Sequence, residues 1–324
     1  MRPTDALPHP GDWNTTSVGE SIEIKRGVSW SKEQEHQTPA PGRVPVIGIK
    51  NVQDRLDLTD VLYLSGLTKR AMEKARVSAG WSVMVGSNGN RARVGNAVLI
   101  REDADYLFAS FLLGVSPKEG RGLRNDYFYR WLASEQVQAY ISASSEGTTG
   151  LNNLSHSFFR AMSVPFPHPD EQAAIARILD AVDMALDRTR AAVERAREVK
   201  RALAQRVFAE GVRGEPTRKT AIGHLPRSWK VVPVNNVVTA FQYGLSVPME
   251  AKGDVAILRM GNIQDGGVLF TDLKFVSLPA KEIAPYRVRK GDVLFNRTNS
   301  QAWVGKVGIY RHDLESPRVF RRLV

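Results

Sequence analysis

The sequence contains no cysteine among its 324 residues. Disulfide bonds, cysteine-ligated zinc, iron–sulfur clusters and thiol catalysis are therefore excluded. No stretch approaches the roughly 18 uninterrupted apolar residues that a membrane-spanning helix requires. The polar, proline-rich N-terminus also lacks the apolar segment of a signal peptide. These absences predict a cytoplasmic protein without a membrane partner.

Catalytic motifs are absent as well. There is no GxxxxGK[ST] phosphate loop, no HExxH zinc motif and no Asn/Asp-Pro-Pro-aromatic motif of amino-methyltransferases. The six histidines are scattered, which argues against a metal site. A nuclease centre around Asp292 and Lys306 is an alternative, although such pairs occur in most proteins. We expect no catalytic residue, no metal and no cofactor in this chain.

Positive charge, in contrast, is in excess. Lys and Arg number 45 against 34 Asp and Glu, a net charge of +11, which favours a polyanionic partner, nucleic acid first and an anionic membrane second. A soluble protein that is merely basic is the alternative. The excess is uneven, because residues 1–169 hold 19 basic and 17 acidic side chains and residues 214–324 hold 17 and 9. The last third therefore carries most of the net charge.

Proline and glycine are missing from residues 170–210, where Ala, Arg, Glu, Leu and Val dominate. This composition predicts one helix of roughly 60 Å. Apolar residues recur alternately four and three positions apart, although Thr189 and Lys200 interrupt the pattern, and this spacing is typical of a coiled-coil seam. A helix packed on its own domain is the alternative. The predicted subunit-interface residues are Ile175, Leu179, Val182, Leu186, Val193, Leu203 and Val207.

The segments on either side of this helix contain short β-type runs and resemble each other. Residues 51–54 (Asn-Val-Gln-Asp) match residues 262–265 (Asn-Ile-Gln-Asp), 211 positions later. Residues 82–85, followed by Val-Gly, match residues 292–295, also followed by Val-Gly, 210 positions later. Ordered matches at a nearly constant offset indicate an internal duplication. The first copy continues through an aromatic helical stretch, 127–141, that the second lacks.

Two loops at equivalent places, 86–93 and 296–302, leave a β-type run and carry Asn, Ser or Thr beside Arg. Arg can donate two hydrogen bonds to guanine and Asn can pair with adenine, while Ser, Thr and backbone N–H groups suit phosphate. A solvated hairpin turn is the alternative. The loop 146–155 has similar residue types. The predicted DNA-binding residues are Ser87, Asn88, Asn90, Arg91, Arg93, Gly147, Thr148, Thr149, Asn152, Asn153, Arg297, Thr298 and Asn299.

Four motifs make the chain resemble the specificity (S) subunit of type I restriction-modification systems. They are the Leu-Pro-Arg-Ser-Trp-Lys segment at 225–230, the Lys-Gly-Asp-Val-Leu-Phe strand at 290–295 and the Ser-Glu-Gly-Thr-Thr loop at 145–149. The most specific is the Val-Pro-Phe-Pro segment at 164–167, which leads through Glu171 and Gln172 to Ile175. The order and spacing of the motifs carry the resemblance over nearly the whole chain.

The resemblance implies an α+β architecture of two mixed α/β target-recognition domains and a long coiled-coil-type helix. The domains expected are 1–167, the first recognition domain; 168–213, the helix; and 214–324, a second, partial recognition domain. In this family each recognition domain reads one half of a bipartite double-stranded DNA target. The subunit itself is not catalytic. It recruits methyltransferase (M) subunits, which carry S-adenosylmethionine, and a restriction translocase (R) subunit, which uses ATP and Mg.

The sequence departs from the family pattern in its last third, where the final part of the second recognition domain and the second long helix are missing. We therefore expect a fragment or a truncated gene product. The alternative is a half-subunit that forms a homodimer through its long helix. A structural coiled-coil adaptor that does not bind DNA is a third hypothesis, which the small net charge of the first domain favours.

Overall fold

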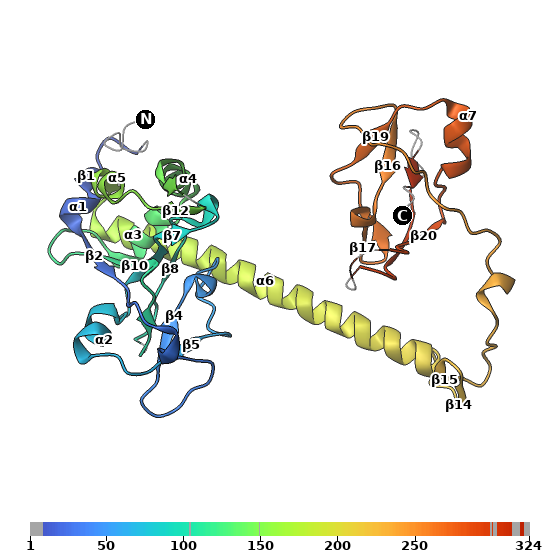
Figure 1. Ribbon diagram of the computed structural model, residues 1–324, viewed down its shortest axis with the longest axis horizontal. Helices are drawn as coiled ribbons and strands as arrows, with labels where there is room; N and C mark the ends of the chain where they lie inside the picture. The colour runs from blue at the N-terminus through green and yellow to red at the C-terminus, as the bar shows by residue number, and fades with distance from the viewer. Residues whose placement is uncertain are drawn as a thin grey trace. The chain divides into compact units, whose positions relative to one another are not determined.

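The computed structural model describes residues 9–103, 105–148, 150–298, 300, 303–312 and 318–320. The chain divides into two compact units, residues 1–201 and 202–324, which are described separately (Figure 1). The predicted fold class, mixed α and β structure with one long helix, is confirmed. The finer division at 167 and 213 stays a prediction.

The first unit is organised around a four-stranded antiparallel sheet in the order β2-β10-β6-β8. Its strands are Ile22–Arg26, Leu112–Pro117, Ser82–Val85 and Ala97–Leu99. Because side chains alternate between the two faces of a strand, Met84 packs into one hydrophobic core while Val83 and Val85 pack into another. The sheet is therefore the shared wall of two cores.

Helices cover the face of the sheet on which Met84 lies. They are α1 (Val18–Ser21), α3 (Asn125–Leu132), α4 (Glu135–Ser144) and α5 (His156–Ala161), together with the antiparallel pair of β1 (Asn14–Ser17) and β13 (Ser163–Phe166). The aromatic stretch predicted to be helical supplies α3, whose Phe128 and Leu132 are fully buried in this core. The stretch 127–141 therefore supplies seven of the nineteen buried residues of this core.

A second sheet closes the other core, in the order β3-β5-β4-β9. Its strands are Glu35–His36, Leu62–Leu64, Val44–Ile47 and Leu107–Phe108, and β4 and β9 run parallel. Helix α2 (Lys69–Ala75) and 3-10 turns at Lys32–Gln34, Ile49–Asn51 and Arg91–Arg93 complete this part. A small third sheet joins β7 (Ser87–Asn88), β11 (Glu146–Thr148) and β12 (Leu151–Asn153).

The predicted long helix is confirmed as α6, Pro169–Glu210. Asp170 and Glu171 lie in its first turn, where carboxylates interact favourably with the helix dipole. Gly211 follows the last helical residue with φ +73°, a left-handed conformation that glycine adopts without strain. Only Gln172 and Ala176 of α6 are fully buried. No helix in the described part of the chain is long and apolar enough to cross a membrane.

The second unit consists of short strands and turns. A hairpin of β14 (Thr217–Thr220) and β15 (Gly223–Pro226) follows α6. Next comes a sheet ordered β19-β16-β22, made of Lys274–Val276, Val255–Leu258 and Arg318–Phe320. The remaining elements are β17 (Ile263–Gln264), β18 (Gly267–Val268), β20 (Val293–Phe295), β21 (Val307–Ile309), α7 (Ala280–Ile283) and 3-10 turns at Val234–Asn236, Met260–Asn262 and Ala284–Tyr286.

The duplication inferred from the sequence is visible in the hydrogen bonds of two buried asparagines. In the first unit, Asn51 Oδ1 accepts from the Gly48 N–H at 2.8 Å, and Nδ2 donates to the carbonyls of Asp57 (2.7 Å) and Asp60 (2.9 Å). In the second unit, Asn262 Oδ1 accepts from the Arg259 N–H at 2.8 Å, and its Nδ2 also donates to two carbonyls, those of Leu269 and Thr271. The two asparagines thus close equivalent turns in the two units.

One of the sequence matches is wrong by one residue. Ser82 lies opposite Leu99, and the equivalent pair in the second unit is Val293 opposite Ile309. Val293 is therefore the counterpart of Ser82, whereas the match at offset 210 paired it with Val83. The loop after β20 is one residue shorter than the loop after β6, so the offset falls to 210 only beyond it. A slip of one residue exchanges the two faces of a strand.

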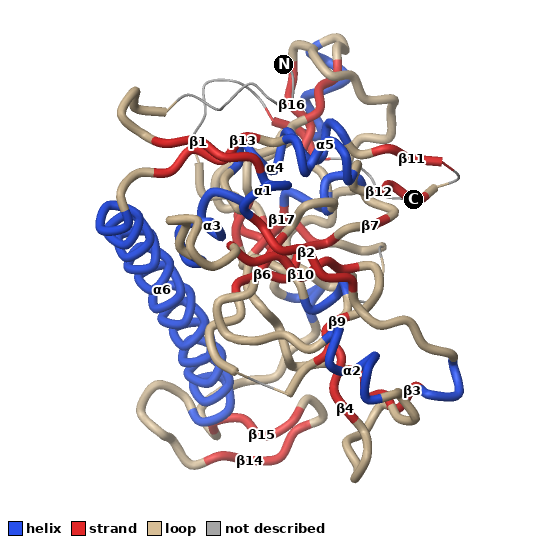
Figure 2. Tube along the Cα trace, turned by 90° about the vertical axis from the view of Figure 1, so that its left-hand side faces the viewer, coloured by secondary structure: helices blue, strands red, loops and turns tan. Residues whose placement is uncertain are grey.

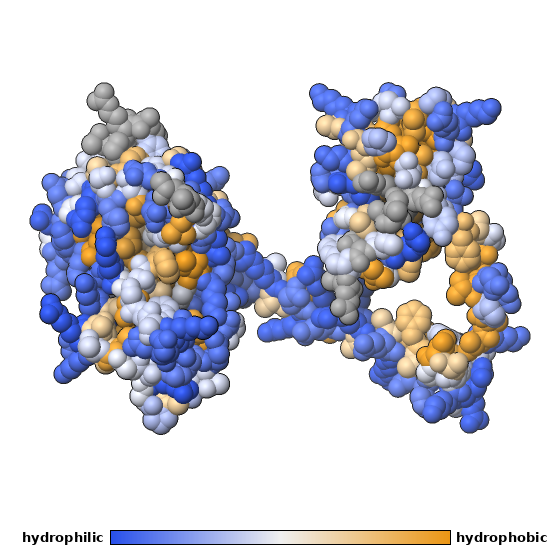
Figure 3. Space-filling view, in the orientation of Figure 1, coloured by the Kyte–Doolittle hydropathy of each residue, from blue (hydrophilic) through white to orange (hydrophobic). Residues whose placement is uncertain are grey.

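The corrected register explains an apolar surface on the second unit. Val293, Phe295, Val307 and Ile309 share one face of β20 and β21 and are 36–60% exposed, and apolar side chains are visible on this unit in Figure 3. The equivalent face of β6 and β8 lies under α3 and α4 in the first unit. The second copy thus repeats the sheet without a helical cover among its described residues.

Candidate nucleic-acid interface

The small sheet brings together two loops that the sequence analysis singled out separately. Strand β12 pairs with β11 on one side, with Gly147 opposite Asn152, and with β7 on the other, with Asn88 opposite Asn152. The Leu154 N–H also donates to the Gly86 carbonyl at 2.8 Å. Loop 86–93 and loop 146–155 therefore form one structural element (Figure 2).

Most polar side chains of this element are engaged within it. Ser87 Oγ donates to Asn153 Oδ1 at 2.8 Å, and Asn152 Nδ2 donates to the Gly89 carbonyl at 3.0 Å. Asn88 and Asn90 accept from backbone N–H groups two residues further on, at 2.8 and 3.0 Å. Such contacts are typical of Asn in turns. They stabilise the loops.

Arg91 holds the end of helix α4. Its Nε donates to the Ser142 carbonyl at 2.7 Å and to Ser145 Oγ at 3.1 Å, and its Nη2 donates to the carbonyls of Ala143 and Ser145. The last carbonyls of a helix have no partner within the helix, so the guanidinium group supplies donors to them. Arg91 thereby ties loop 86–93 to the residues that immediately precede β11.

Arg93 has a comparable role on the other side of the loop. Its Nη2 donates to the Val52 carbonyl at 2.7 Å and to the Ile49 carbonyl at 3.3 Å. These carbonyls flank the turn that the buried Asn51 closes. The arginines for which base contacts were predicted thus hold the loop in place through hydrogen bonds to backbone carbonyls. Base contact by Arg91 and Arg93 stays a prediction.

Two threonines and a glycine complete the predicted site in the first unit. A Cβ on Gly147 would lie 2.7 Å from Asn152 Oδ1, so a larger residue here would require the Asn152 side chain to shift. Thr148 ends β11, and Thr149 lies outside the described residues. Contact of the two threonines with DNA stays a prediction.

The equivalent loop of the second unit carries one aromatic contact. The Arg297 guanidinium carbon lies 5.3 Å from the centre of the Tyr243 ring, within the range of a cation–π contact. Thr298 is half-buried, and Asn299 lies outside the described residues. The described strands show no counterpart of the β7-β12-β11 sheet in this unit.

Gln172 is a structural residue that the sequence analysis noted only as part of a motif. It is fully buried, its Nε2 donates to the carbonyls of Gly122 (2.7 Å) and Pro167 (2.8 Å), and its Oε1 accepts from the Arg124 N–H at 2.8 Å. A buried amide satisfied by three backbone groups fixes one orientation of the helix. Gln172 thereby anchors the start of α6 to the first unit.

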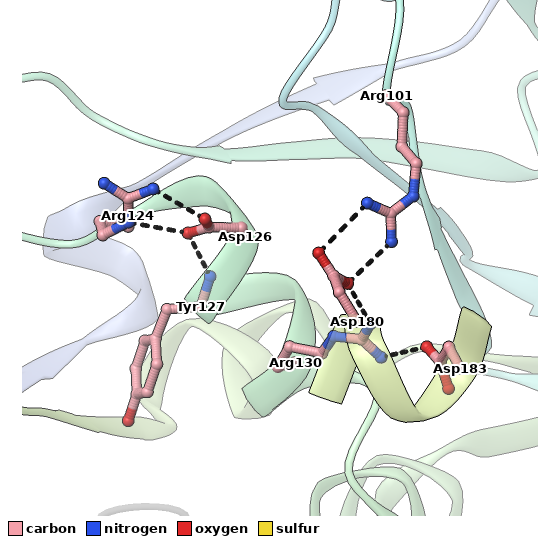
Figure 4. Close-up of polar contacts among 7 residues, drawn as sticks. All are labelled: Arg101, Arg124, Asp126, Tyr127, Arg130, Asp180 and Asp183. Carbon is pink, nitrogen blue, oxygen red and sulfur yellow. Dashed lines mark hydrogen bonds and ion pairs between the residues drawn. The ribbon is translucent and has the colours of Figure 1, made fainter. Parts of the chain in front are cut away.

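Ion pairs continue this attachment along α6 (Figure 4). Arg130 of α3 contacts Asp180 and, at 2.6 Å, Asp183, while Arg101 contacts Asp180 at 2.9 Å. The hydrogen bond from Arg101 holds the pKa of the Asp180 carboxyl below its usual value, against the effect of burial, and Arg130 adds to the lowering. One turn or so further along, Asp187 pairs with Arg55 at 3.2 Å. The acidic stripe of α6 therefore faces the first unit.

The predicted interface residues divide into two groups. Ile175 packs against the core of the first unit, so at this position the alternative hypothesis, packing on the helix's own domain, describes the contact. Val207 is half-buried. Five residues are 41–58% exposed and form the exposed stripe of α6: Leu179, Val182, Leu186, Val193 and Leu203. Among the described residues, no group of three or more His, Asp or Glu could hold a metal ion.

Comparison with known proteins agrees with this architecture. Residues 10–195 match the family described as "Type I restriction modification DNA specificity domain". Because the match spans more than half of the sequence, the chain belongs to this family. It covers most of the first unit and the first two thirds of α6.

Two curated relatives are specificity subunits of type I restriction enzymes. The chain is 25% identical over 296 residues to the StySPI specificity subunit of Salmonella potsdam, and 26% identical over 307 residues to the EcoKI specificity subunit of Escherichia coli K12. The alignments cover 90% and 93% of this chain but only 63% and 65% of these relatives. A crystal structure of a type I S subunit from M. genitalium aligns over 96% of the chain at 16% identity, with a TM-score of 0.47.

Proposed function

We propose that this chain recognises DNA sequence for a type I restriction-modification complex and catalyses no reaction itself. The observation that carries the proposal is the repetition of one asparagine-closed unit before and after a long helix. Two similar domains are suited to the two halves of a bipartite target. The net charge of +11 supports binding to a polyanion. An adaptor without DNA binding would need neither the duplication nor the charge.

The partners proposed follow from the family. Methyltransferase subunits would bring S-adenosylmethionine, and a restriction subunit would bring ATP and Mg, so that this chain needs no cofactor of its own. We also propose a cytoplasmic location, which the absence of cysteine supports. The proposed DNA contacts are those of the two joined loops in the first unit and of loop 296–302 in the second.

Selection from a random duplex DNA pool tests the proposal. The chain, together with a methyltransferase subunit of a type I system, is expected to enrich two short sequence blocks separated by a spacer of constant length. Binding should weaken steeply with salt, because phosphate contacts release counterions. Enrichment of no sequence, with the protein folded, would contradict the proposed function.

A single substitution refines this experiment. Asn152→Ala is expected to relax the preference within one sequence block and leave the other block unchanged, since Asn152 belongs to the first unit alone. The loss of one base contact corresponds to about 1–3 kcal/mol, which is roughly a 5-fold to 160-fold loss of discrimination. Asn236→Ala, at an exposed position of the second unit far along the sequence, is the matched control. Unchanged discrimination by Asn152→Ala would remove this residue from the interface.

We further propose that the exposed stripe of α6 packs against a second helix, either that of a second copy or that of a partner subunit. Analytical ultracentrifugation of the chain alone should show dimers at micromolar concentration if two copies pair. Val193→Asp should shift them to monomers, because a carboxylate in an apolar seam loses its hydration. Glu198→Gln, on the same helix, serves as the control. A monomer in all cases would exclude the homodimer.

A further inference from the structure

Arg91 and Arg93 of the joined loops donate hydrogen bonds to backbone carbonyls. Other basic side chains beside these loops are therefore candidates for contact with phosphate. Three basic side chains lie beside these loops without belonging to any sequence motif: Arg26 at the end of β2, and His156 and Arg160 on α5. Arg26 and Arg160 are exposed and His156 is half-buried. We refer to these three residues as the basic cluster.

The sheet register places Arg26 at the end of the central sheet where the loops begin. Arg26 lies opposite Leu113 of β10, and Leu113 lies opposite Met84 of β6. Two residues after Met84, the Gly86 carbonyl accepts from the Leu154 N–H. His156 follows Leu154 by two residues and begins α5. Arg26 also shares a strand face with Ile22 and Ile24, which pack into the core that α5 covers.

The two arginines also act on the charge of His156. Burial lowers the pKa of His156, and the positive charges of Arg26 and Arg160 lower it further. In the described part of the chain, neither arginine forms an ion pair with a carboxylate. Helix α1, which packs against α5, carries Glu20, and this carboxylate faces the Ser17 N–H at 3.5 Å. The two arginines therefore form a positive site without a carboxylate partner among the described residues, and His156 adds an imidazole beside them.

We propose that Arg26, His156 and Arg160 bind backbone phosphates of duplex DNA and thereby hold the duplex against loops 86–93 and 146–155. This inference rests on the proposed function and adds the part of the interface that is independent of sequence. Phosphate contacts set the register and orientation of a protein on DNA, whereas base contacts supply specificity. Two exposed guanidinium groups suit phosphate because each can donate two parallel hydrogen bonds. Because the charge of the first domain is nearly balanced overall, its attraction to DNA would depend on a local cluster of this kind.

The salt dependence of DNA binding tests this proposal. Fluorescence anisotropy with a labelled random-sequence duplex measures the slope of log K against log salt concentration for the full chain. Each lost phosphate contact lowers the slope by about 0.9, so Arg26→Ala/Arg160→Ala should lower it by about 1.8. The affinity of the double alanine variant should fall by the same factor for every DNA sequence, because phosphate contacts do not depend on sequence. Arg26→Lys/Arg160→Lys keeps both charges and should retain most of the slope, which separates charge from misfolding.

Arg121→Ala is the matched control, because Arg121 is exposed in the same unit and follows β10 at the opposite end of the central sheet. A double alanine variant with the affinity and slope of Arg121→Ala would overturn the proposal. If the wild-type chain binds every sequence equally but the double variant lowers the slope, the cluster stands and the proposed sequence recognition fails. If the wild-type chain binds no DNA at all, both are overturned.

Discussion

Replacing Gln172 with leucine is expected to destabilise the first unit by about 3 kcal/mol, because three backbone groups, among them the buried Pro167 carbonyl, lose the side-chain amide with which they pair. Leucine has a similar size but neither donates to the Gly122 and Pro167 carbonyls nor accepts from the Arg124 N–H. Urea unfolding followed by circular dichroism and tryptophan fluorescence measures the effect. The unfolding transition whose midpoint shifts in the variant should be that of the first unit together with the start of α6.

Gln205→Leu is the control for this variant, since Gln205 lies on the same helix and is exposed. Its effect should stay within about 0.5 kcal/mol, as for most surface substitutions. Equal unfolding midpoints for Gln172→Leu and Gln205→Leu would show that the buried amide does not anchor the helix.

Replacing Asp180 with asparagine should cost about 2 kcal/mol at pH 7, because Asp180 accepts charge-assisted hydrogen bonds from two arginines. The cost is below that of a fully buried pair, since the Asp180 side chain is 30% exposed. The variant leaves Arg130, of which 12% is exposed, with Asp183 alone. Urea unfolding of both proteins at several pH values measures the difference in free energy.

The pH dependence of this difference has a definite sign. The pKa of Asp180 is lowered in the folded protein, so its stabilising contribution is present above the pKa of an unfolded aspartate, about 3.9, and is lost as the pH falls through the lower folded value. The wild type and Asp180→Asn should therefore differ at pH 7, and the difference should shrink as the pH falls below about 3.9. Glu198→Gln, at an exposed position further along the same helix, should show no such convergence. A difference that persists unchanged at low pH would contradict the role of the charge.

Together, Gln172 and Asp180 define how the chain leaves the first unit. The buried amide fixes the first turn of α6, and the ion pairs of Arg101 and Arg130 fix the fourth. In a protein that reads a bipartite target, the direction in which this helix leaves the domain would set the distance between the two half-sites. The two variants above would then alter spacer preference as well as stability.

Local sequence patterns were sufficient for the helix and the duplication. The absence of proline and glycine over 170–210 predicts a helix because these are the residues that interrupt one, and α6 ends within one residue of that stretch. The Asn-x-Gln-Asp repeat was equally informative. The two asparagines close equivalent turns, and this local role keeps the pattern recognisable.

The same patterns were insufficient for the strand register and for the role of polar side chains. Val293 resembles Val83 in type, yet pairing shows that it corresponds to Ser82. Arg91 has the type and the position of a DNA contact, yet it donates to carbonyls about fifty residues away in the sequence. Nothing in the local sequence distinguishes these two uses of a guanidinium group.

The sequence by itself determined that this protein has one long helix between two related domains and belongs with DNA specificity subunits. Those conclusions depend on periodicity, composition and the order of motifs, which are properties of neighbouring residues. Only the tertiary structure decided that loops 86–93 and 146–155 form one element, that α6 is anchored through Gln172, and that Arg26 lies beside α5. These features depend on contacts between distant segments, because a hydrogen bond or a charge acts on whatever the fold brings within a few ångströms.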